Sequence, residues 1–125
     1  MRRVVVDAGV LLGWFDAANA RGSLRTEYEA GVLTVIAPRG LVADVLGTLA
    51  NEGVPPERLA RIGTELQRIG LQLQDAPMAE LATWLARGLP PHRAAYPALA
   101  ASLEVPLVTD DPELRRAADA VLLRD

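Results

Sequence analysis

The stretch VPLVTDD at residues 105–111 is an apolar run that ends in two aspartates, and VVVD at residues 4–7 repeats this pattern near the other end. A buried parallel strand is typically a continuous run of aliphatic residues. Ligands of open α/β sheets bind beyond the carboxyl ends of such strands, and carboxylate oxygens are the ligands that Mg²⁺ prefers. We therefore expect Asp7 and the pair Asp110 and Asp111 to form one acidic site, although an aspartate at a strand end also commonly caps the next helix.

Strand-like and helix-like segments alternate along the whole chain, which predicts an α/β fold with a mostly parallel central sheet. The chain has 125 residues and no long linker, so we expect a single domain over residues 1–125. Strands are predicted at residues 3–6, 33–37, 71–74, 105–109 and 121–123. Helices are predicted at residues 10–15, 23–30, 41–50, 78–87 and 92–103, with further helices starting near Pro56 and Pro112.

The composition excludes several kinds of site. The absence of cysteine excludes disulfides and thiolate zinc sites, and a single histidine leaves oxygen as the main metal ligand. The absence of lysine excludes a P-loop and Schiff-base chemistry. A net charge of −3 means that any nucleic-acid binding needs a local basic patch. Four of the five aromatic residues, Trp14, Phe15, Trp84 and Tyr96, fit core or dimer contacts better than a base-stacking platform.

No apolar stretch is long enough to span a bilayer. The chain begins with basic residues followed by an apolar run, as a signal peptide does, but Asp7 ends this run too early for a signal peptide. We therefore expect a cytoplasmic protein with no membrane partner.

Three segments together resemble the PIN-domain ribonucleases, most closely the VapC-type toxins of bacterial toxin–antitoxin pairs. They are VVVDAGVLL at residues 4–12, APRGLVADVL at residues 37–46, and residues 93–111, in which AAYPALA precedes VPLVTDD. The third is the most specific, because it is a long, ordered match. The resemblance implies a PIN-like three-layer α/β/α sandwich, a homodimer and, for toxin members, a small antitoxin partner that covers the site.

The resemblance also implies the site residues. The family's first, second and fourth acids correspond to Asp7, Asp44 (in place of the usual glutamate) and Asp111. These residues would hold Mg²⁺ or Mn²⁺ and catalyse hydrolysis of RNA phosphodiesters, since the bound ion activates water and stabilises charge on the phosphate. Thr109 is expected to hydrogen-bond the acidic cluster. The third acid is replaced by Arg93, so the acidic site departs from the family pattern.

Arg93 has three open interpretations: it clamps substrate phosphate, it forms ion pairs with Asp7 or Asp111 and inactivates the site, or it points to solvent. Asp110 could replace the lost acid or cap the helix that starts at Pro112, and we favour the cap. Two functions follow. The first is a ribonuclease whose activity Arg93 reduces or abolishes, and the second is an inactive PIN-like module that binds RNA or a protein partner.

Overall fold

The structure is a computed structural model that describes residues 2–14, 23–117 and 122–123. Within these residues the elements follow one another in an alternating order. They are β1 (Arg2–Val6), α1 (Ala8–Trp14), α2 (Ser23–Glu29), β2 (Leu33–Pro38), α3 (Leu41–Asn51), α4 (Pro56–Arg68), β3 (Gln72–Gln74), α5 (Met78–Ala86), α6 (Pro91–Leu103), β4 (Leu107–Val108), α7 (Pro112–Ala117) and β5 (Leu122–Leu123).

The five strands form one sheet in the order β3-β2-β1-β4-β5, and every pairing in it is parallel. Strand β1 lies in the middle, with Val5 opposite Ile36 of β2 and Val6 opposite Val108 of β4. The two ends of the chain therefore supply neighbouring strands. The predicted α/β class is confirmed, and the sheet is parallel throughout the described strands.

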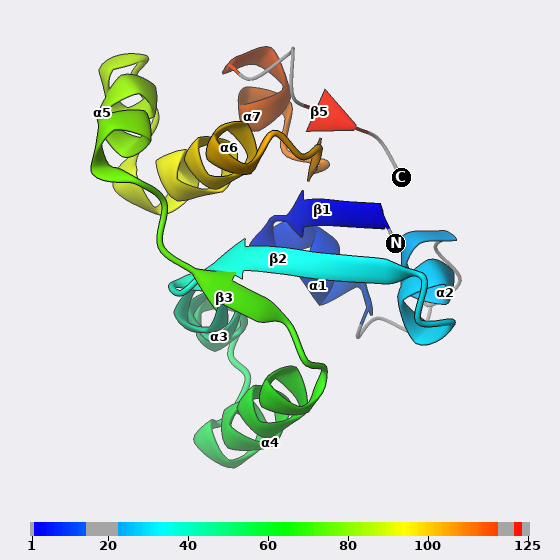
Figure 1. Cartoon of the computed structure of the whole chain (residues 1–125). Helices are drawn as coiled ribbons and strands as arrows, with labels where there is room; N and C mark the ends of the chain where they lie inside the picture. The colour runs from blue at the N-terminus through cyan, green and yellow to red at the C-terminus, as the bar shows by residue number, and fades with distance from the viewer. Residues whose placement is uncertain (1, 15–22, 118–121, 124–125) are drawn as a thin grey trace.

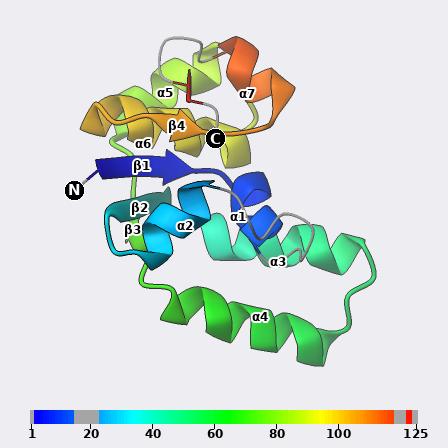
Figure 2. The ribbon, with the colours of Figure 1, turned by 90° about the vertical axis from the view of Figure 1, so that its right-hand side faces the viewer.

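Both faces of the sheet are covered by helices. Val4, Val5 and Val6 are each 0% exposed, and successive side chains of a strand point to opposite faces. Helix α6 contacts β1, β2 and β4, and α1 packs against α3. In Figures 1 and 2, α5, α6 and α7 gather on the β4 side of β1, and α3 and α4 lie on the β2 side. The architecture is the predicted three-layer α/β/α sandwich.

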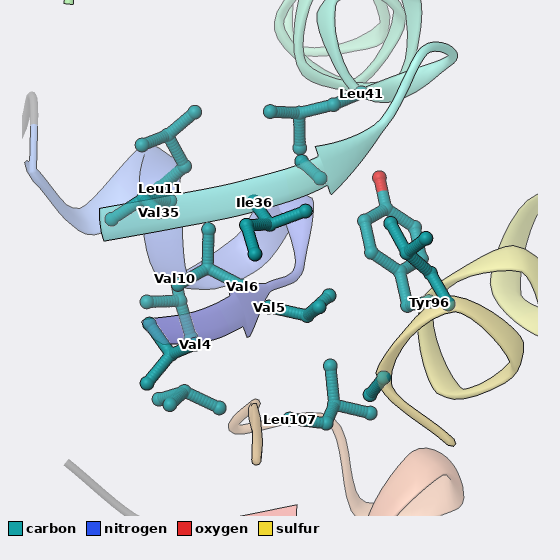
Figure 3. Packing of buried hydrophobic residues seen from close by; sticks show 14 of the residues in the cluster. Val4, Val5, Val6, Val10, Leu11, Val35, Ile36, Leu41, Tyr96 and Leu107 are labelled. Atoms are coloured by element: carbon teal, nitrogen blue, oxygen red, sulfur yellow. The ribbon is translucent and has the colours of Figure 1, made fainter. Parts of the chain in front are cut away.

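The hydrophobic core is centred on β1 and its neighbours. Figure 3 shows Val5, Ile36 and Leu107 packed together, with the ring of Tyr96 from α6 beside them. Trp14, Trp84 and Tyr96 are buried, which confirms the core interpretation for these three aromatics. Phe15 lies outside the described residues.

Strand β4 is shorter than the predicted residues 105–109. The N–H of Val105 donates to the carbonyl of Ala100 at 3.1 Å, where α6 ends, and Pro106 has no N–H to give to the sheet. The carbonyl of Pro106 still accepts from Val5 at 2.9 Å. In the last predicted strand, Val121 lies outside the described residues. None of the described helices has the length and apolar composition needed to span a membrane.

Candidate active site

The parallel pairing of β1 with β4 delivers the two ends of the chain to the same edge of the sheet. Val6 is opposite Val108, so Asp7 and Thr109 leave their strands side by side. The N–H of Asp7 donates to the carbonyl of Val108 at 3.3 Å. The predicted meeting of strand ends distant in sequence is therefore present in the fold.

Asp7 has a cap role and also lines the site. It is 6% exposed. Its Oδ1 accepts a hydrogen bond from the N–H of Val10 at 2.9 Å, and its Oδ2 accepts one from the hydroxyl of Thr109. Burial raises the pKa of this carboxyl, and the nearby Asp111 and Asp110 add to the increase, while the two hydrogen bonds oppose it. The expectation that Thr109 binds the acidic cluster is confirmed.

Asp44 reaches the site from the first turn of α3, which begins shortly after β2 ends. Its Oδ2 accepts a hydrogen bond from the hydroxyl of Tyr96 at 2.8 Å. Tyr96 is 3% exposed, and burial, followed by the Asp44 carboxylate, raises its pKa far above the usual range. The phenol therefore stays protonated and acts as a donor. Figure 3 shows its hydroxyl at the carboxyl end of β2, directed toward α3.

Asp111 organises the start of α7. Its Oδ1 accepts from the N–H of Glu113 at 2.9 Å, and its own N–H donates to the Thr109 hydroxyl at 3.0 Å. Asp110 is exposed and pairs with Arg115, whose Nη2 lies 2.9 Å from Asp110 Oδ1. The prediction that Asp110 caps α7 is wrong. The capping residue is Asp111, whose side chain accepts the hydrogen bond from the N–H of Glu113.

Arg93, on the first turn of α6, forms ion pairs within the site. Its Nη1 donates to Glu113 Oε2 and lies 3.4 Å from Asp111 Oδ2. Of the three interpretations, the structure therefore shows an ion pair, made with Asp111 and Glu113. Sequence reasoning missed Glu113. It also assigned Tyr96 only to core or dimer contacts, since a buried tyrosine gives no sequence signal about its hydroxyl partner.

Four of the predicted residues line one open cavity of about 230 Å³: Asp7, Asp44, Arg93 and Asp111. Tyr96 also contributes to its wall. The described lining does not include Thr109, which lies behind Asp7, or Asp110, which faces Arg115.

The metal-binding capacity of the cavity follows from its donors. Carboxylate oxygens suit Mg²⁺ and Mn²⁺. However, no three His, Cys, Asp or Glu side chains among the described residues lie close enough together to hold an ion. Two carboxylates can hold Mg²⁺, because this ion keeps several of its waters. The described residues thus fit a hydrated ion on few protein ligands, and they do not form a closed three-ligand centre.

A second cavity, of about 240 Å³, has a described lining that does not include Asp7, Asp44 or Asp111. Its described lining comes from α1, α2, α4 and the residue after α4: Trp14, Arg25, Tyr28, Glu29, Glu65 and Ile69. It contains none of the predicted site residues, so the acidic cavity is the candidate active site.

Two solved structures resemble this chain over nearly its whole length. The crystal structure of PAE2754 from Pyrobaculum aerophilum matches with a TM-score of 0.70 and 22% identity, covering 98% of this chain and 90% of that chain. The structure of VapBC2 from Rickettsia felis, bound to a DNA fragment from their promoter, matches with a TM-score of 0.69 and 10% identity, covering 98% of both chains. No family model and no curated protein matches the sequence. At these identities the likeness shows the fold alone. Because VapC proteins are PIN domains, it supports the PIN-like fold.

Proposed function

We propose that this chain is a PIN-domain ribonuclease of the VapC type, which hydrolyses RNA phosphodiesters with Mg²⁺ or Mn²⁺ held by Asp7 and Asp111, while Asp44 assists directly or through a water molecule. One observation carries the proposal. Three carboxylates from separate elements line a single cavity at the carboxyl edge of a parallel sheet, which is where ligands of such sheets bind.

The residues of the chain prepare the site in distinct ways. Thr109 and the Val10 N–H hold the buried carboxylate of Asp7, and Tyr96 holds Asp44. A bound divalent ion would lower the pKa of a water molecule and offset charge on the phosphate. Arg93 opposes this, because its guanidinium neutralises part of the charge of Asp111. We therefore expect activity below that of a site with an acid at position 93.

The proposal includes the partners implied by the sequence. The Rickettsia felis neighbour is a VapBC2 complex. We propose that this chain likewise binds a small antitoxin protein, forms a homodimer and works in the cytoplasm on RNA.

A second function is an inactive PIN-like module that binds RNA or a protein. Two observations favour it: Arg93 pairs with Asp111, and the described residues contain no three-ligand metal group. It predicts that the natural protein does not bind Mn²⁺ and that Arg93→Asp creates binding.

Cleavage of a panel of RNAs with Mn²⁺, with Mg²⁺ and with EDTA tests the first function. We expect metal-dependent cleavage that Asp7→Asn abolishes. Asp75→Asn is the matched control, since Asp75 directly follows β3 at the same sheet edge, is exposed and is absent from the described cavity lining. Its activity should equal that of the wild type. If no RNA is cleaved and calorimetry detects no Mn²⁺ binding, the ribonuclease function is wrong and the inactive PIN-like module is the function that remains.

A further inference from the structure

Arg93 lies in the wall of the acidic cavity and uses only one of its nitrogens. Nη1 donates to Glu113 and approaches Asp111. Among the described residues, Nε and Nη2 of Arg93 have no hydrogen-bond partner. The side chain is 35% exposed and lines the cavity.

The charge of the cavity gives these free donors a use. Asp7, Asp44 and Asp111 together repel any phosphate that enters. Among the described lining residues, Arg93 is the only one with a fixed positive charge. A guanidinium presents its N–H groups as a planar fork that matches two oxygens of a phosphate. Arg93 is therefore the group in this wall that can attract an anionic substrate.

Glu113 holds this guanidinium in place without sharing the cavity. It belongs to the first turn of α7 and is not among the described lining residues. Nη1 of Arg93 donates to Glu113 and lies near Asp111. The Nε and Nη2 donors of Arg93 therefore stay available for another ligand. The ion pair thus orients a cation whose remaining donors are unused.

We propose that Arg93 is a phosphate-binding residue and that Glu113 is its positioning residue, so that the cavity binds a phosphate of single-stranded RNA without a metal ion. The choice of RNA rests on the proposed function. The binding step itself does not depend on cleavage.

The test is fluorescence anisotropy of a labelled single-stranded oligouridylate in EDTA, measured over a series of salt concentrations. We expect Arg93→Gln to weaken binding about tenfold and to reduce the slope of log affinity against log salt by about 0.7, the value for one phosphate contact on a single strand. Arg93→Lys keeps the charge but lacks the fork, so it should weaken binding less. Arg116→Gln removes the same charge from an exposed position of α7 and should change affinity by less than about twofold.

Glu113→Gln separates positioning from simple charge. Removing a negative charge beside the cavity should tighten RNA binding if Glu113 only repels phosphate. If Glu113 orients Arg93, the same variant should weaken binding several-fold, against the direction of the charge change. Circular dichroism checks that each variant folds. If Arg93→Gln does not fold, Arg93→Lys and Glu113→Gln carry the test.

The proposal is overturned by any of three results: no RNA binding by the wild type in EDTA, equal losses in Arg93→Gln and Arg116→Gln, or tighter binding by Glu113→Gln. If Arg93→Gln does not fold, unchanged binding by Arg93→Lys also overturns it. Cleavage with Mn²⁺ is measured separately. If RNA binds through Arg93 but is never cleaved, the proposed ribonuclease function is wrong and this inference stands. If RNA is cleaved but substitution of Arg93 leaves RNA affinity unchanged, the ribonuclease function stands and this inference is wrong.

Discussion

At the scale of single residues, the buried hydroxyl of Tyr96 is the contact that fixes Asp44. Aspartate is one methylene shorter than glutamate, so the carboxylate of Asp44 has a short reach from α3. The tyrosine approaches from α6 and lines the same cavity. Tyr96, which is buried in the core, thereby also positions Asp44 of the site.

Tyr96→Phe removes this hydrogen bond and leaves the ring in place. We expect the free energy of unfolding to fall by about 1 kcal/mol and Mn²⁺ affinity to fall about tenfold or more, as for other groups that orient metal ligands. Calorimetry measures the affinity, and urea unfolding measures the stability. Tyr28→Phe is the control, because Tyr28 is half-buried on α2 and lines the other cavity. An unchanged Mn²⁺ affinity in Tyr96→Phe would show that Asp44 needs no such support.

Asp7 costs stability at neutral pH, because burial disfavours its charged form. Its pKa in the folded protein is raised above the ordinary value of 3.8. The unfolded chain releases the Asp7 proton near pH 3.8, whereas the folded protein releases it at a higher pH. The free energy of unfolding therefore falls as pH rises from 3.8 to the folded pKa, and above that pH the full destabilisation is present. Asn can accept from the N–H of Val10, and its amide can donate to the Thr109 hydroxyl, so Asp7→Asn keeps a hydrogen bond to each partner while reversing the one with Thr109.

We therefore expect Asp7→Asn to be more stable than the wild type at pH 7, by roughly 1 kcal/mol, as is common when a functional group is removed. The difference should vanish below about pH 3.8. Urea unfolding of both proteins from pH 3 to pH 8 measures it. A variant that is less stable than the wild type at neutral pH contradicts this account of Asp7.

At the scale of elements, helix α7 is short and depends on its first turn. Asp111 contributes the hydrogen bond to the Glu113 N–H and also faces Arg93 from α6. One side chain therefore links the start of α7, the ion pair and the cavity. The same position serves a structural role and a proposed catalytic one.

The cap and the charge of Asp111 can be separated by two substitutions. Asn caps helices as well as Asp does, whereas Ala does not. We expect Asp111→Ala to be about 1 kcal/mol less stable than Asp111→Asn, with RNA cleavage lost in both. Urea unfolding gives the comparison. Equal stabilities of the two variants would show that the cap contributes nothing.

At the scale of the whole molecule, the strand order assembles the cavity. Strand β1 lies between β2 and β4, so residues near the start, the middle and the end of the chain reach one edge of the sheet. Ligand binding at this edge should therefore stabilise the entire fold, because an unfolded chain cannot bring the acids together.

We expect Mn²⁺ at ten times its dissociation constant to raise the free energy of unfolding by about 1.4 kcal/mol. Thermal unfolding with Mn²⁺ and with EDTA measures this increase. Asp7→Asn should lose it, whereas Arg93→Asp should show it at a lower Mn²⁺ concentration. Equal stabilisation of Asp7→Asn and the wild type would place the ion elsewhere.

Most of the architecture was predictable from local patterns. The aliphatic run at residues 4–6 and the helical spacing of apolar residues indicate the strands and helices, because burial on one or both faces imposes those periods. The presence of Asp7, Asp44 and Asp111 at one cavity was implied by the resemblance of their stretches to a known family, and the structure brings the three residues together there. The extent of β4 could not be predicted, because it depends on the hydrogen bond that Val105 makes with Ala100 at the end of α6.

The sequence by itself determined the fold class, the position of the acidic cavity and the presence of a cation at residue 93. Only the tertiary structure decided what that cation contacts. Arg93 pairs with Glu113 and Asp111, and Tyr96 reaches Asp44, through contacts between elements that are far apart in the chain. Periodicity records which face of an element is buried. It carries no information about which polar partners meet across the packed layers, because that depends on how the helices and strands are placed in space.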